Sequence, residues 1–221
     1  FSFIGIGLGV AVLIIVMSVM NGFRTELINK IVGFNAHVTI KPYESGIDNN
    51  KLNNNILRLL SNEIIFSNSG EAVVVSKDYT KGIVLRGYNK KDFPKLDIIK
   101  NGNLIGKSNN LHLNNISIGR ELSFNLNLNI GDKITIMSPT AIDTIIGSLP
   151  RQDTFIVNSI FDSGLADFDT NVAFINLKSL EIFFDFKKKD RVLEIYLKKP
   201  ANIENIKPEI QKIFNNDYVY T

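Results

Sequence analysis

Few residues in this sequence have the types and spacing that catalysis or metal binding requires. The chain contains no cysteine, which excludes disulfides and cysteine-based metal sites or nucleophiles. Its two histidines, His37 and His112, are far apart and have no acidic partners at ligand spacing, so each is expected to be structural. Asp162, Asp167 and Asp169 cluster around a Ser-Gly pair, but they lack the alternating ligands of a calcium loop. We therefore expect a surface turn there, and we predict no metal and no cofactor.

Motifs for nucleophilic catalysis and phosphate binding are also missing. The sequence contains no Gly-x-Ser-x-Gly elbow, no His-Glu-x-x-His and no phosphate-binding loop. Gly5-Ile6-Gly7-Leu8-Gly9 has glycines spaced as in a dinucleotide site, but here they lie inside a continuous apolar stretch instead of following a strand. We interpret Gly5 and Gly9 as a small-residue face against which a neighbouring membrane helix packs. The protein is not expected to be an enzyme.

The first 23 residues predict a transmembrane helix. Phe1 to Phe23 contains no charged residue and is almost entirely apolar residues and glycine. In a helix, about twenty such residues span the roughly 30 Å hydrocarbon core of a bilayer. A signal peptide would need a basic start and a small-residue cleavage site, and neither is visible. Because the chain begins with Phe instead of Met, we expect it to be a fragment of a longer protein.

Residues 24–35 are predicted to continue this helix as a stalk. Leu27, Ile28 and Ile31 recur at helical spacing among polar residues, and Gly33 suits a helix C-cap. A helix that enters a soluble domain without a flexible linker can transmit movement to it. A plain interfacial helix would give the same pattern.

The composition beyond the helix indicates an ordinary folded domain. The net charge is +3, and 25 basic residues are scattered among 22 acidic ones, which does not favour a nucleic-acid partner. A length of 221 residues is ample for a sizeable core.

The pattern of apolar residues predicts an α+β fold in which two βαβ-like halves are separated by an insert. The first half covers 36–75 and the second covers 190–221. Their expected elements are strands at 37–41 and 64–75 (the latter interrupted at 68–70), a short helix at 52–60, strands at 191–197 and 217–220, and a helix at 203–214.

The insert, residues 76–189, is predicted to be rich in strands with its own small core. Strands are expected at 82–88, 104–105, 133–137, 154–161 and 172–175. We also expect a short helix over 117–126 and a second helix over 176–184, capped by Asn176.

A long connection at 138–152 interrupts the insert. Its prolines disfavour regular strand pairing, and about fifteen residues is long for an ordinary loop. Its middle is apolar, which argues against disorder. The loop either folds back onto the core or projects an apolar surface towards a partner, and the residues leave both open. The candidate contact residues are Pro139, Ile142, Ile145, Ile146, Leu149, Pro150 and Arg151.

Several stretches resemble the lipoprotein-releasing permeases of the LolC/LolE family. The most specific of them is the run Met-Ser-Val-Met-Asn-Gly-Phe at 17–23, in the first membrane helix. The stretches Ile118-Gly119-x-x-Leu122, Ile130-Gly131-Asp132 and Phe161-Asp162-Ser163-Gly164 match further family motifs. The likeness extends over the whole chain with consistent spacing.

The resemblance implies a permease subunit in the bacterial inner membrane with its main domain in the periplasm. It implies an ABC ATPase subunit dimer, where ATP hydrolysis would take place, and a second permease subunit in a homo- or heterodimer. Such a transporter extracts lipoproteins from the membrane and hands them to a LolA-like periplasmic carrier. Residues 36–75 with 190–221 would be the porter-like subdomain, and 76–189 the sabre-like one, whose hook loop (138–152) grips the carrier.

The same resemblance assigns further contacts and leaves two rivals. Met17, Met20 and Phe23 are where a lipid anchor would rest, although contact with membrane lipid explains them equally well. Arg151 would form charge-assisted bonds to the carrier. The rivals are a MacB-like efflux permease and an FtsX-like scaffold that recruits a cell-wall hydrolase. The identity of the partner separates the three.

Overall fold

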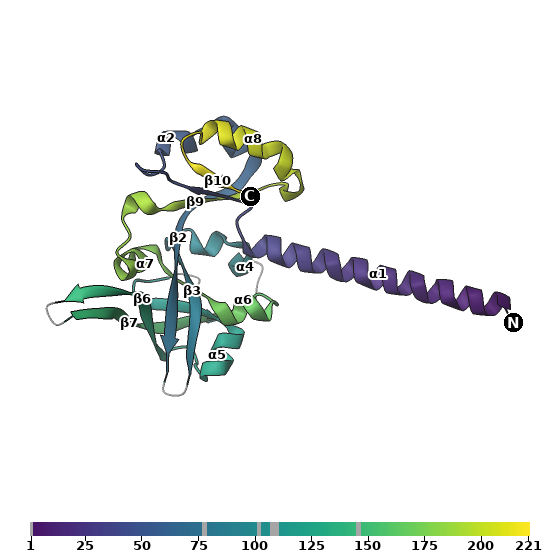
Figure 1. Cartoon of the computed structure of the whole chain (residues 1–221), viewed down its shortest axis with the longest axis horizontal. Helices are drawn as coiled ribbons and strands as arrows, with labels where there is room; N and C mark the ends of the chain where they lie inside the picture. The colour runs from purple at the N-terminus through teal and green to yellow at the C-terminus, as the bar shows by residue number, and fades with distance from the viewer. Residues whose placement is uncertain (1, 77–78, 101–102, 107–110, 145–146) are drawn as a thin grey trace.

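A computed structural model describes residues 2–76, 79–100, 103–106, 111–144 and 147–221 of the chain. One long helix, α1 (Ser2–Phe34), projects from a folded body whose buried apolar side chains form three clusters. Figure 1 shows α1 extending to one side of this body, with the N-terminus at its far end.

Helix α1 runs without a break from the apolar stretch into the predicted stalk. Its most apolar window has a mean hydropathy of 2.7, and no part of that window is buried, so the helix is long and apolar enough to cross a membrane. It ends at Phe34, close to the predicted end. Gly33, however, does not have the positive φ of a glycine cap. Instead, Arg86 Nη1 donates to the carbonyl oxygen of Phe34 at 3.4 Å.

The two ends of the remaining chain form one four-stranded antiparallel sheet in the order β10-β1-β9-β2. Each βαβ unit brackets a strand of the other, so the two halves interlock as split βαβ units. Helices α3 and α8 cover one face of this sheet through a shared apolar core. The elements are β1 (Val38–Lys41), α2 (Asn49–Leu52), α3 (Asn55–Leu60), β2 (Ser61–Val75), β9 (Val192–Leu197), η3 (Pro200–Asn202), α8 (Ile203–Ile213) and β10 (Tyr218–Tyr220).

The insert closes into a six-stranded ring. Its strand pairs run β2-β3-β8-β5-β7-β6 and return to β2. Inward-facing side chains from all six strands form one apolar core, to which α5 and α7 contribute. The insert's elements are β3 (Thr80–Tyr88), η1 (Phe93–Lys95), α4 (Asp97–Lys100), β4 (Asn103–Gly106), β5 (Asn115–Gly119), α5 (Arg120–Leu126), β6 (Lys133–Thr144), β7 (Gly147–Asp162), α6 (Ala166–Asn171), β8 (Val172–Asn176), α7 (Leu177–Phe184) and η2 (Lys188–Asp190).

Strand β2 joins the two parts of the body. Its first half pairs with β9 in the terminal sheet, and from Ser67 onward it pairs with β3 in the ring. The predicted interruption at 68–70 is wrong, because β2 is continuous there. Gly70 allows this continuity: the ring of Phe184 in α7 lies 2.7 Å from where a Cβ would stand. Any larger residue there would require the ring of Phe184 to move.

Two other expectations also differ from the structure. Residues 117–119 belong to strand β5 instead of the predicted helix, which begins only at Arg120. Ile116 and Ile118 point into the ring core, so their alternation is that of a strand. The single helix expected at 52–60 is two short helices, each starting after a side-chain cap, from Asp48 and from Asn54. The predicted Asn176 cap of α7 is confirmed, since its side chain accepts from the N–H of Lys178.

Candidate functional site

The predicted hook is an ordered β-hairpin and not an irregular loop. Strands β6 and β7 stay paired almost to their ends, with Ala141 opposite Pro150 and Ile142 opposite Leu149. Pro139 is accommodated because the register shifts between Met137 and Ala141, and the ladder resumes beyond this shift with Pro150 opposite Ala141. Ile145 and Ile146 lie outside the described residues.

The hairpin reaches away from the membrane helix. Figure 1 shows β6 and β7 extending from the ring on the side opposite to α1. Near its tip, Leu149 is 49% exposed, and Pro150 beside it is exposed as well. Pro139 is also exposed, at the base of the hairpin. An exposed leucine on a paired, proline-containing hairpin offers apolar contact area with little conformational freedom to lose on binding.

Arg151 is engaged within the chain. Its guanidinium donates to the carbonyl oxygens of Ile182 and Phe183, in the last turn of α7. A cation at this position satisfies carbonyls that have no partner within the helix, and it complements the helix dipole. The assignment of Arg151 as a carrier contact stays a prediction. A substitution there would disturb the end of α7 as well.

The membrane-helix residues singled out in the sequence all lie exposed along α1. Met17, Met20 and Phe23 are each at least 60% exposed. A Cβ added at Gly5 or Gly9 would meet no atom of the described chain within 4 Å, so both glycines are open to a neighbouring helix. Their roles in lipid contact and helix packing stay predictions.

A buried polar cluster, which the sequence did not reveal, lies where α1 meets the body. We call it the joint cluster: Ser67, Arg86, Tyr88, Glu194 and Tyr196. Glu194 is 6% exposed and accepts hydrogen bonds from all four other members, at 2.7 to 3.2 Å. A signal was present, because Glu194 is the only charged residue in its apolar strand and Arg86 follows the apolar run Ile83-Val84-Leu85, where an unpaired charge is costly. Their pairing was hidden because they lie 108 positions apart in the sequence.

The electrostatics of the joint cluster keep Arg86 charged and both tyrosines protonated. Burial would lower the pKa of Arg86, but the neighbouring Tyr88 and Glu194 more than offset it, so the guanidinium stays charged. Burial, reinforced by Glu194, raises the pKa of both tyrosines, so their hydroxyls remain donors.

The Asp162 to Asp169 segment is a tight turn that supports the end of α1. Asp169 is buried and accepts from the N–H of Ser163 at 2.9 Å, and Asp162 binds Arg120 at 2.6 Å. In α6, the ring of Phe168 stacks on Phe34 with centroids 4.0 Å apart. Within the described part of the chain, no group of three or more potential metal ligands comes together.

His37 has a structural position. Its Nδ1 accepts from the N–H of Leu197 at 2.7 Å, and this bond ties the start of the terminal sheet to the end of β9. Burial lowers the pKa of His37, which fits an imidazole that must stay neutral to accept.

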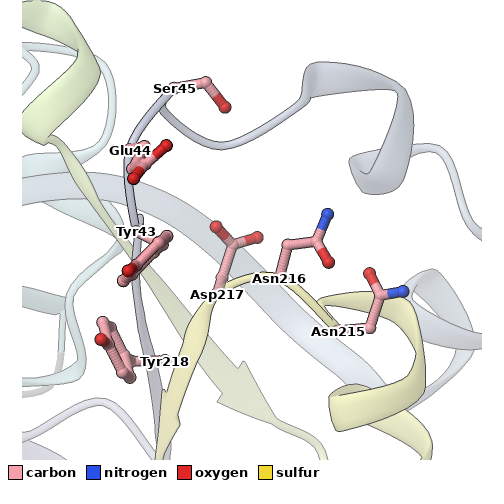
Figure 2. Close-up of a pocket in the computed structure, with 7 residues that line it drawn as sticks. All are labelled: Tyr43, Glu44, Ser45, Asn215, Asn216, Asp217 and Tyr218. Atoms are coloured by element: carbon pink, nitrogen blue, oxygen red, sulfur yellow. The ribbon is translucent and has the colours of Figure 1, made fainter.

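A surface hollow of about 560 Å³ lies at the edge of the terminal sheet (Figure 2). Tyr43 and Tyr218 form one side of it, with ring centroids 5.6 Å apart at 67°. Asp217 contributes a carboxylate, but Lys51 holds it at 3.2 Å. The other polar groups of the hollow come from exposed loop residues, so its lining offers no paired nucleophile and base.

Comparison with known proteins identifies the class. The chain belongs to the family described as the MacB-like periplasmic core domain, which matches residues 1–213. The periplasmic region of MacB from Actinobacillus actinomycetemcomitans aligns with a TM-score of 0.48 at 8% identity, covering 86% of this chain and 91% of that one.

Within this family the chain is of the LolC/LolE type, as its sequence motifs predicted. It is 26% identical, over 100% of its length, to the "Lipoprotein-releasing system transmembrane protein LolC" of Neisseria meningitidis, of which it covers 55%. It is 30% identical to the LolC of Buchnera aphidicola subsp. Acyrthosiphon pisum, over 98% of this chain and 55% of that protein. The chain therefore spans about half the length of these curated relatives.

Proposed function

We propose that this chain is the N-terminal part of an ABC transporter permease subunit that releases lipoproteins from the bacterial inner membrane. In this proposal α1 spans the membrane, the soluble body stands in the periplasm, and a separate ATPase subunit dimer supplies the energy. A second permease subunit completes the transporter. The terminal sheet corresponds to the porter-like subdomain and the ring to the sabre-like one.

The observation that carries the proposal is the β6–β7 hairpin. It reaches away from α1, so with α1 in the membrane its tip stands at the far side of the body, where a soluble periplasmic protein can approach (Figure 1). Its paired strands and prolines keep it stiff, and Leu149 and Pro150 offer an apolar tip. These properties suit the hook that grips a LolA-like carrier, and the likeness to LolC supports the same assignment.

The remaining predicted contacts fit this proposal. Met17, Met20 and Phe23 lie on α1 at the level where an acyl anchor would leave the outer leaflet. The Gly5 and Gly9 face would pack against a neighbouring membrane helix of the transporter. A MacB-like efflux permease would share the stalk and a periplasmic domain but would lack the hook, and an FtsX-like scaffold would recruit a cell-wall hydrolase instead of a lipoprotein carrier.

The affinity of the hairpin for a LolA-like carrier tests the proposal. Leu149→Asp, made in the full-length permease, should weaken carrier binding by roughly tenfold or more, because it removes apolar contact area and buries a charge. Phe124→Asp is the matched control: Phe124 is 82% exposed, on α5, away from the hairpin. Equal affinity of the wild type and Leu149→Asp would reject the hook assignment.

A further inference from the structure

The end of α1 is held where both parts of the body meet. Strand β2 passes from the terminal sheet into the ring at Ser67, which pairs with Val192 of β9 on one side and with Tyr88 of β3 on the other. The joint cluster lies at this crossing, with members on β2, β3 and β9. Any group that binds both this cluster and α1 therefore fixes the helix to both parts at once.

Arg86 is that group. Its Nη2 donates to Glu194 Oε1 at 3.2 Å, and its Nη1 donates to the carbonyl oxygen of Phe34 and to Asn35 Oδ1, both at 3.4 Å. The guanidinium carbon also lies 5.5 Å from the centroid of the Phe34 ring, within the range of a cation–π contact. One planar side chain thus joins the last turn of α1 to a buried carboxylate of the body.

Glu194 holds Arg86 in this orientation. Its Oε1 accepts from Ser67, Arg86 and Tyr88, and its Oε2 accepts from Tyr88 and Tyr196. The side chains of Arg86 and Glu194 are only 13% and 8% exposed. A carboxylate fixed by several donors cannot rotate without breaking several bonds at once, so the guanidinium that it binds is fixed too.

The other contacts of the α1 end, with α4 and with aromatic rings, constrain its direction less. Phe34 stacks on Phe168 and packs near Phe174, and such apolar ring contacts allow sliding and rotation. A cleft of about 300 Å³ lies beside the joint, between the end of α1, the terminal sheet and α6. Packing therefore keeps Phe34 buried, but it leaves room for the helix to tilt.

We propose that Arg86 and Glu194 form an orientation lock, which sets the angle at which the body stands on α1. Buried ion pairs often add little net stability compared with apolar residues, but they can select one arrangement over others. The lock keeps the body and α1 moving as one unit, and it determines where the hairpin lies relative to the membrane. It acts whichever partner the hairpin binds, so it goes beyond the proposed function.

Distances between spin labels on the whole chain in lipid nanodiscs test this proposal. Labels are placed on cysteines substituted at exposed positions, Arg24 in α1, Asn125 in α5 and Asn205 in α8, and the chain has no native cysteine to interfere. The pairs Arg24–Asn125 and Arg24–Asn205 measure distances between α1 and the body. The pair Asn125–Asn205 measures a distance within the body alone. The wild type should give narrow distributions for all three pairs.

The decisive variant makes the joint cluster apolar, with Ser67→Ala, Arg86→Met, Tyr88→Phe, Glu194→Leu and Tyr196→Phe. Its melting temperature should match or exceed that of the wild type, because no buried polar group of the cluster is left unpaired. Both distributions that involve α1 should nevertheless broaden at least about twofold, whereas the Asn125–Asn205 distribution stays narrow because β2 runs through both parts.

Three results would overturn the orientation lock. The first is α1-to-body distributions in the apolar variant that remain as narrow as in the wild type. The second is an equal broadening within the body. The third is an equal broadening in the control Lys95→Met, which breaks a surface ion pair with Asp92 and Glu63.

A single substitution decides the question if the apolar variant fails to fold. Arg86→Lys keeps the charge beside Glu194, but one ammonium group cannot also reach the end of α1. It should broaden the two α1-to-body distributions, and wild-type widths in this variant would reject the lock.

Discussion

Replacing Glu194 by glutamine tests the energetics of the joint cluster most sharply. The change preserves the shape of the side chain but removes its charge and turns one acceptor oxygen into a donor. Both carboxylate oxygens are in use, so the hydroxyls that donate to the replaced oxygen must turn round to accept from the new NH2 group. Arg86, 13% exposed, loses its only ion-pair partner among the described residues.

The expected cost follows from this burial. Removing one partner of a buried, hydrogen-bonded ion pair typically destabilises a protein by about 3–5 kcal/mol. For a chain of this size, about 1 kcal/mol shifts the melting temperature by roughly 2–4 °C, so Glu194→Gln should lower it by about 6–20 °C. The assay is thermal unfolding of the whole chain in detergent micelles, followed by circular dichroism.

Two companion variants make the measurement interpretable. Glu63→Gln removes one partner of the exposed Lys95 on the surface of the same body, and it should cost at most about 1 kcal/mol. The double variant Arg86→Met/Glu194→Gln has no unpaired buried guanidinium. Its loss of unfolding free energy should therefore be smaller than the sum of the losses in the two single variants, by about 1 kcal/mol or more. A loss below about 1 kcal/mol for Glu194→Gln, or single losses that add within about 0.5 kcal/mol, would refute the reasoning.

Three further predictions concern other parts of the body. Because burial keeps the pKa of folded His37 below its ordinary 6.5, the unfolded chain takes up the proton first as the pH falls, so stability should decline below about pH 6.5 but not above it. His37→Asn keeps a hydrogen-bond acceptor and should flatten this decline in the free energy of unfolding, measured by denaturant titration at several pH values. An unchanged decline would show that another group causes it. Gly119→Ala should destabilise the fold by about 1–3 kcal/mol or more, because its Cβ would stand 2.1 Å from the carbonyl oxygen of Asp169. At Gly82 an added Cβ would meet no atom within 4 Å, so Gly82→Ala should be neutral or slightly stabilising. Equal losses of stability in the two variants, measured by chemical unfolding, would contradict this. Arg151→Gln should cost roughly 0.5–1 kcal/mol through the end of α7, and wild-type stability in thermal unfolding would show that its helix contact contributes nothing.

The sequence predicted those parts of the fold in which local pattern and burial agree. The uncharged run before Phe23 predicted a membrane-length helix, and alternating apolar residues located most strands of both parts. The cap at Asn176 was visible because a side chain that accepts from the helix start is a local feature.

The errors arose where long-range contacts override local preference. Asn68, Ser69 and Gly70 have turn-like preferences, but they lie inside β2 because pairing with β3 and close packing of α7 favour a continuous strand there. The prolines of the hairpin suggested an irregular loop, but a register shift accommodates Pro139 and Pro150 lies in the ladder opposite Ala141. Neither the pairing and packing around Gly70 nor the strand pairing of the hairpin can be predicted from neighbouring residues in the sequence.

The joint cluster escaped prediction for a related reason. Arg86 and Glu194 lie on strands at opposite ends of the insert, and only closure of the ring and pairing of β2 with both β3 and β9 bring them together. A charged residue alone in an apolar strand indicates that a partner exists, without identifying it.

A photo-crosslinker at Leu149, in the full-length protein within its native membrane, tests the central claim most directly. We expect capture of a soluble lipoprotein carrier, with no such capture from the control position Phe124 on α5. Capture of a cell-wall hydrolase or of an efflux component at Leu149 would contradict the lipoprotein-release function, and crosslinks only to this chain's own core would contradict the hook.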